Sequence, residues 1–407
     1  MPFQFRFIPF IPLLLAVVVG CASHGDRLRL IRASFYQGDM ESARAGIDEH
    51  LKRPKQREGD VLKLDQAIID LTTGNTRQAE STLREVRDRF ELLEQKTAAE
   101  GIGSMLTDDN AVAYAGEDYE KVLIRVFLAL ANLMHDGGDA GAYALQVGQK
   151  QDRIVQSATK MRTSGDSEEE VNPKLAYKRV PVGVYLYGVM REGTLMNYDD
   201  AVRSYQTVVE WLPEFEQAQH DLERARSGVH SKPENGVVYV FGLVGRGPYK
   251  EQVNAEVSQT ALFAATMIIN ALGSRSVTPG IAPVLIPMVV QPRNLVGKLK
   301  VEAEWEEENV VCLSETITDV GKMAEEQCAA VETQTIARAV ARRAVKKGIL
   351  YGIKEATDAN PYVSLAMDIG GMIWEGRETA DTRCWGLLPE TIQVARLELP
   401  AGDRRIT

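Results

Sequence analysis

Histidine is the side chain best suited to acid–base chemistry near neutral pH, so its placement limits the catalysis that a sequence can support. No histidine follows His230, which leaves the carboxyl-terminal half without an imidazole base. No H-E-x-x-H or G-x-S-x-G motif occurs, and no close histidine–cysteine pair suggests zinc. The five histidines are His24, His50, His135, His220 and His230. We therefore predict no catalytic site, no metal and no cofactor.

Two other patterns deserve comparison with known chemistry. Glu306–Glu308 could supply the paired carboxylates of a glycosidase or muramidase, but consecutive glutamates in a turn are more often solvated. Gly242, Gly245 and Gly247 do not follow the G-x-G-x-x-G order of nucleotide sites, and Pro248 would break a following helix. We interpret these glycines as a bend and expect no nucleotide.

Three thiols lie in the second half of the chain, at Cys312, Cys328 and Cys384. They allow at most one internal disulfide, between Cys312 and either of the others, so the chain is not a disulfide-rich scaffold. We favour the alternative that all three are small buried apolar side chains.

A fourth cysteine, Cys21, follows a segment with the composition of an export signal. Arg6 supplies a positive start, and the apolar run Phe7–Val19 is too short to span a bilayer. The run ends in Val18, Val19 and Gly20 directly before Cys21. This order resembles the bacterial lipobox, with Val18 where leucine is commoner, and implies a diacylglycerol on the Cys21 thiol after removal of residues 1–20.

The alternative is an ordinary signal peptide cut near Ala22, with Cys21 unmodified. With the lipid in place, residues 21–26 form a tether, and two or three acyl chains anchor firmly in a bilayer. Ala22 at the second position favours, by resemblance to Gram-negative sorting rules, an outer-membrane lipoprotein facing the periplasm. The formal charge of −10 and the 44% hydrophobic content fit an exported globular protein and argue against a nucleic-acid partner.

An unevenly spaced repeat runs through the first half of the chain, and its first two glycines lie 36 residues apart, close to the 34-residue tetratricopeptide period. Glycine, which accepts positive φ, recurs where two antiparallel helices would be joined, and an alanine five positions later would let those helices approach closely. A later copy adds an aromatic start and a proline at the end of its second helix. The residues that define the repeat are Gly38, Ala43, Gly74, Ala79, Gly137, Ala142, Tyr198, Ala201 and Pro213.

We predict four degenerate tetratricopeptide-like α-hairpins over residues 27–229, because single hairpins must stack to bury their apolar faces. Residues 230–236 are rich in turn formers and read as a linker. Residues 237–407 are expected to form a smaller α+β domain, which makes the fold class mainly α. Such stacks usually offer a concave face to a protein; alternatively, the helices only hold the second half away from the membrane.

Several elements are expected in the second half. The β-branched and aromatic run Val237–Phe241 and the alternating run Val296–Trp305 predict strands. Helices are expected over Val257–Leu272, Asp319–Thr357 and Tyr362–Trp374, while 281–290 reads as core or packed edge. In the long helix, small residues would permit close packing, and its basic residues either face solvent or bind an acidic partner. The small residues are Ala337, Ala341, Ala344, Gly348 and Gly352, and the basic ones are Arg338, Arg342, Arg343, Lys346 and Lys347.

The most distinctive stretch is Asp381–Pro389, which reads D-T-R-C-W-G-L-L-P, followed by Ile392–Arg396. It resembles the carboxyl-terminal signature D-T-R-x-W-x-x-L-P-x-x-I-Q-x-A-R of a poorly characterised family of bacterial lipoproteins with tetratricopeptide-like amino-terminal halves. Ala115–Glu120, Val237–Lys250 and Ile336–Lys347 are similar to that family too. The chain departs at Cys384, where serine or another residue is expected. The resemblance implies no catalytic residues and a place beside envelope lipoproteins that activate penicillin-binding proteins.

These observations lead to a non-catalytic envelope scaffold as the expected function. Its partners would be the bilayer, through acylated Cys21, and one or more envelope proteins, through the helical repeats. The alternative is a regulator or binder of peptidoglycan or of its synthases, acting through the carboxyl-terminal domain. A cell-wall hydrolase is the third hypothesis.

Overall fold

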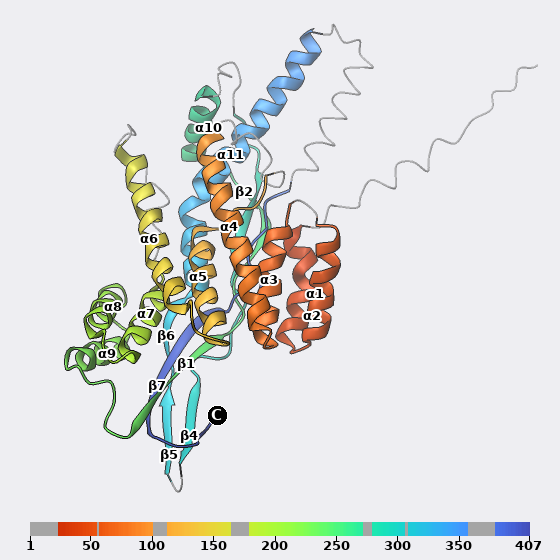
Figure 1. The fold of residues 1–407 in the computed structure, drawn as a ribbon. Helices are drawn as coiled ribbons and strands as arrows, with labels where there is room; N and C mark the ends of the chain where they lie inside the picture. The colour runs from red at the N-terminus through yellow and green to blue at the C-terminus, as the bar shows by residue number, and fades with distance from the viewer. Residues whose placement is uncertain are drawn as a thin grey trace, which may run out of the picture.

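The computed structural model describes residues 23–54, 57–100, 112–163, 179–271, 279–305, 308–356 and 379–407. Within these ranges the protein is mainly α. Nine helices precede the first strand and pack in chain order, each against the next (Figure 1). They are α1 His24–Tyr36, α2 Met40–Lys52, α3 Gly59–Thr72, α4 Thr76–Glu100, α5 Asp118–Leu133, α6 Ala140–Thr163, α7 Pro181–Gly193, α8 Tyr198–Trp211 and α9 Glu216–Arg226.

The turns between paired helices are where the glycines predicted them. Gly38, Gly74 and Gly137 have φ of 83°, 81° and 73°, a conformation that glycine adopts without strain. In the fourth hairpin Leu195, rather than a glycine, takes positive φ at 59°. The first eight helices therefore form four hairpins, α1–α2, α3–α4, α5–α6 and α7–α8, and α9 follows them.

The alanines that were expected to pack between helices do so in three hairpins. Ala43, Ala79 and Ala201 are fully buried. The prediction for Ala142 is wrong, because this residue is exposed. Gly137 lies three positions before the next helix, whereas Gly38 and Gly74 each lie two positions before theirs. Tyr143 therefore holds the equivalent position and donates its backbone N–H to Asp139, as Ala43 does to Asp39.

In the described part of the second half, the strands form three small antiparallel sheets. The first has the order β1-β7-β6 and lies against the helices, the second pairs β2 with β3, and the third has the order β5-β4-β8. The strands are β1 Asn235–Val244, β2 Tyr249–Ala255, β3 Val284–Val290, β4 Lys300–Trp305, β5 Glu308–Leu313, β6 Glu315–Asp319, β7 Thr391–Pro400 and β8 Arg405–Ile406.

The predicted strand over 296–305 is thus shorter than expected, since β4 begins only at Lys300. Asp319 ends β6, and the long helix α11 runs from Val320 to Ala356, close to its predicted range. Helix α10 covers Gln259–Ala271 and packs on α11 (Figure 1). The small residues of α11 serve this contact: Ala337 and Ala341 are buried with Ala261 and Ala265 of α10. Tyr362–Trp374 lies outside the described residues.

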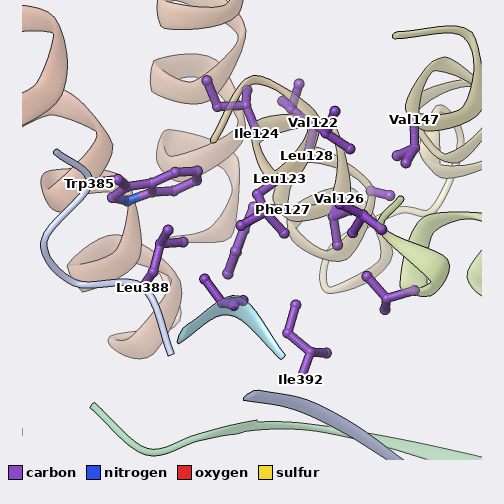
Figure 2. Packing of buried hydrophobic residues seen from close by; sticks show 14 of the residues in the cluster. Val122, Leu123, Ile124, Val126, Phe127, Leu128, Val147, Trp385, Leu388 and Ile392 are labelled. Carbon is purple, nitrogen blue, oxygen red and sulfur yellow. The ribbon is translucent and has the colours of Figure 1, made fainter. Parts of the chain in front are cut away.

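The helices and the first sheet share one hydrophobic core. This core includes side chains from α1 to α9 together with Ile317, Val320, Trp385, Leu388 and Ile392. Figure 2 shows Trp385, Leu388 and Ile392 lying toward the α5 side chains Leu123 and Phe127. Burial of apolar surface is the main stabilising contribution in a domain, so the helical and strand-containing parts stabilise each other. No helix of the described residues is both long and apolar enough to cross a membrane.

Candidate functional site

The first helix of each hairpin (α1, α3, α5 and α7, here the inner helices) faces the chain's own carboxyl-terminal region. The stretch Asp381–Pro389, here the signature segment, lies on α1, α3 and α5, and β7 continues from it. An extended segment crossing helices cannot satisfy its backbone groups within itself, so it needs partners from its surroundings. The inner helices supply them.

Two buried carboxyl groups accept hydrogen bonds from the backbone of the signature segment. Glu120 of α5 accepts from the N–H of Trp385 at 2.8 Å, and Asp65 of α3 accepts from the N–H of Leu387 at 2.9 Å. Burial raises the pKa of both carboxyls, to about 8 for Asp65. At Glu120 the neighbouring charge of Glu117 adds to this effect. Asp65 is therefore protonated at neutral pH, and both groups act as fixed hydrogen-bond acceptors.

The other end of the segment is held by the glycine bend. The carbonyl of Leu388 accepts hydrogen bonds from the N–H of Gly247, at 2.9 Å, and from the hydroxyl of Tyr36, at 3.2 Å. A Cβ atom on Gly247 would lie 2.1 Å from this carbonyl oxygen, so only glycine fits. Gly242 lies within β1, so the predicted bend is confined to 245–247, where Gly247 allows close contact with the signature segment.

Arg383 and Cys384 of the signature segment are both buried. Arg383 donates to both carboxylate oxygens of Asp381, at 2.8 and 2.7 Å, and to the carbonyl of Val112 at 2.8 Å. Burial raises the pKa of the Cys384 thiol to about 12, which keeps it protonated and a poor nucleophile. Cys312, Cys328 and Cys384 are all free thiols, so the possible disulfide is not formed; only Cys384 is buried, and the other two are half-buried.

A cavity of about 460 Å³ opens at the amino-terminal end of α5. Its wall carries both apolar and charged side chains, and we call it the polar cavity for the charged ones. Its wall brings together residues from all four stretches that carried the family resemblance, namely Glu117, Lys250, Arg338 and the pair Asp381 and Arg383. Lys250 forms an ion pair with Glu117, which also accepts from the Gln327 amide at 3.2 Å. Sequence reasoning did not place a site here, and the only signal was that these four stretches shared one resemblance.

An apolar groove of about 500 Å³ opens at the opposite, carboxyl-terminal ends of the inner helices. Its walls are the last turns of α3, α5 and α7 together with one face of β1. Leu133, Met134 and Leu243 at this groove are 41%, 59% and 46% exposed, which is high for large apolar side chains. The signature segment and β7 thus lie between the polar cavity and the apolar groove.

Three of the five histidines form buried or half-buried pairs with carboxylates. His24 lies 2.7 Å from Glu58, His135 lies 2.6 Å from Glu80, and His230 lies 3.1 Å from Glu192. Each carboxylate also pairs with an arginine. Arg27 joins α1 to the start of α3 and Arg224 joins α9 to α7, whereas Arg84 lies on the same helix as Glu80. None of the described residues forms a cluster of three or more potential metal ligands.

The remaining predicted residues are placed as follows. Tyr198 begins α8, and the exposed Pro213 comes just after the cap of that helix at Leu212. Cys21, Val18, Val19 and Gly20 lie outside the described residues. Of the basic residues on α11, Arg343 donates to the carbonyls of Ala282 and Pro283, at 3.0 and 2.8 Å.

Comparisons of this chain with known protein families, with curated proteins and with solved structures find no match.

Proposed function

We propose that this chain is a membrane-anchored, non-catalytic adaptor of the bacterial envelope. A lipid on Cys21 holds it at the periplasmic face of the outer membrane, and a partner protein docks in the apolar groove. The observation that carries the proposal is the groove itself, with Leu133, Met134 and Leu243 exposed at its margin. Exposed apolar surface next to a concave site marks places where another molecule binds.

The chemistry of the groove favours apolar side chains over a polar ligand. Its two hydroxyl groups already have partners: that of Thr72 donates to the Ile68 carbonyl at 2.9 Å, and that of Tyr239 accepts from Arg224 at 3.1 Å. A polar ligand would lose its hydration there without gaining hydrogen bonds. The face of the inner helices above the groove is already covered by the chain's own signature segment and β7.

We propose a non-catalytic role because the reactive groups of the signature segment and its contacts are buried or hydrogen-bonded within the fold. The Cys384 thiol is protonated because burial raises its pKa to about 12. The Asp65 and Glu120 carboxyls accept hydrogen bonds from backbone N–H groups of the signature segment. A nucleophile needs an adjacent base within hydrogen-bonding reach, and these groups serve as structural contacts instead.

The test uses full-length protein in cells with a photo-crosslinking amino acid at Met134. We expect one envelope protein to be crosslinked from this position. The control places the same amino acid at Leu92, which is 43% exposed on α4, outside the groove, and should crosslink nothing in common. Cys21→Ser should release the protein from membranes and abolish the crosslink. A soluble wild-type protein, or identical products from both positions, would overturn the proposal.

A second candidate, a binder of cell-wall peptides, is favoured by the polar cavity. Among the described residues, Arg338 at this cavity has no ion-pair partner, and the buried Oε1 of Gln327 has no hydrogen-bond partner. Such groups could recognise the carboxylate of a short peptide. Sedimentation of the full chain with purified peptidoglycan tests this function. Arg338→Ala should then reduce binding, and equal sedimentation of both forms would argue against the cavity.

A further inference from the structure

The strand that lines the apolar groove is also the edge of the first sheet. In the order β1-β7-β6, β1 pairs with β7 along all ten of its residues, Asn235 to Val244. Every second residue of an antiparallel edge strand directs its N–H and C=O away from its neighbour. On the side of β1 away from β7, no strand of the described residues pairs with these N–H and C=O groups.

This edge lacks the features that normally protect an exposed strand. Natural edges carry charges or prolines, or they are very short. The sequence from Asn235 to Val244 contains no charged residue and no proline. The opposite edge, β6, is only five residues long and carries Glu315 and Asp319. The sheet therefore has one protected edge and one long, apolar, unprotected edge.

The unprotected edge and the groove are continuous. Tyr239, Phe241 and Leu243, at alternate positions of β1, line the groove floor. The central strand β7 lies beside β1 (Figure 1). Its side chains Ile392 and Val394 are buried in the core shared with the helices. A strand added beside β1 would place every second side chain on the same face, below the ends of α3 and α5.

We propose that the groove takes an extended segment of a partner protein, which adds to β1 as a fourth strand with apolar side chains at every second position. This inference rests on the proposed docking function and names the form of the docked segment. A helix or an acyl chain could fill the apolar walls, but neither would satisfy the row of N–H and C=O groups along β1. Strand addition satisfies both, since backbone pairing provides affinity and the groove selects side chains.

The test begins with a library of random twelve-residue peptides selected on the full mature chain. We expect enriched peptides to carry apolar residues at positions i, i+2 and i+4. One enriched peptide and a permuted version with apolar residues at i, i+3, i+4 and i+7 are then compared by fluorescence anisotropy. The permuted peptide should bind at least about tenfold more weakly, because a helical spacing places its apolar side chains on both faces of a strand.

Two matched variants locate the binding site. Leu243→Lys puts a charge on the edge beside the groove, as natural protected edges do, and should weaken peptide binding at least about tenfold. Leu313→Lys makes the same change on β5, where Leu313 is 56% exposed, and should leave binding within about twofold. Hydrogen exchange of the wild-type protein should show new protection of β1 amides when the peptide is bound.

Other outcomes would overturn the inference. The first is tighter binding of the peptide with the helical pattern, and the second is that Leu243→Lys weakens the binding of no selected peptide. The third is that phosphatidylglycerol vesicles displace the peptide and the β1 amides show no new protection from hydrogen exchange. The fourth is a dimer of the protein that Leu243→Lys abolishes. The two proposals fail separately. A helical peptide in the groove would leave the docking function intact, whereas loss of the Met134 crosslink in cells would remove the docking function itself.

Discussion

The backbone N–H of Trp385 donates a hydrogen bond of 2.8 Å to Oε1 of Glu120, a residue 265 positions earlier in the chain. Both residues are fully buried, and the centroid of the Trp385 ring lies 5.2 Å from that of Phe127, which is about two helical turns further along α5 than Glu120. The bond therefore fixes the signature segment to the middle of the helical stack and sets the depth at which its tryptophan enters the core.

Replacing this tryptophan tests how much the segment stabilises the fold. Trp385→Ala should lower the free energy of unfolding by about 3–5 kcal/mol, because it removes a fully buried aromatic side chain and leaves a cavity. Urea denaturation followed by circular dichroism at 222 nm measures the change. Trp211→Ala, at a half-buried site on α8, is the control and should have a smaller effect. Equal losses would show that the segment contributes no special stability.

The parts of this fold that depend on local sequence could be predicted. Gly38, Gly74 and Gly137 sit at the expected turns because positive φ is a local demand. The long helix α11 follows from its own composition. The prediction that Ala142 packs between helices is wrong because the spacing from Gly137 does not reveal the one extra residue between that glycine and the next helix.

The candidate sites could not be predicted because they depend on contacts between distant residues. Asp65 lies in a helix whose pattern gives no reason for a buried carboxyl, and its partner, Leu387, is 322 positions away. The groove likewise combines the ends of three helices with a strand edge. Neither the fit of the signature segment nor the missing neighbour of β1 has a local sequence signal.

The glycine bend provides a second test of how the segment is held. Gly247→Ala should destabilise the protein by about 1–3 kcal/mol, because the new methyl group would overlap the Leu388 carbonyl. Gly236→Ala is the matched control, since a Cβ at that position on β1 meets nothing within 4 Å. Thermal denaturation of both variants gives the comparison. A Gly247→Ala protein as stable as the control would mean that the bend can open without cost.

The three thiols should differ in reactivity. In native Cys21→Ser protein, iodoacetamide should modify Cys312 and Cys328, which are half-buried, well before Cys384. Burial both blocks access to Cys384 and raises its pKa to about 12, so little thiolate is present. Mass spectrometry of digested samples follows each site over time. In urea all three should react at similar rates, and rapid native labelling of Cys384 would show that the signature segment leaves the core.

The Asp65 carboxyl should make stability fall as pH rises. Burial, with Oδ2 unpartnered, raises its pKa from 3.8 unfolded to about 8 folded. The contribution of Asp65 to the free energy of unfolding is therefore complete below pH 4. It is lost progressively up to pH 8, by about 1.4 kcal/mol per pH unit. Asp65→Asn keeps an oxygen for the Leu387 N–H but cannot titrate. Its unfolding free energy, relative to wild type, should increase between pH 5 and 8 and level off above that. Glu94→Gln is the control: although burial opposes ionisation of Glu94, ion pairs with Lys121 and Lys150 lower its pKa to about 2, so its difference from wild type should stay constant in this window. A flat Asp65→Asn difference would mean that water reaches the carboxyl and the segment is not sealed against α3.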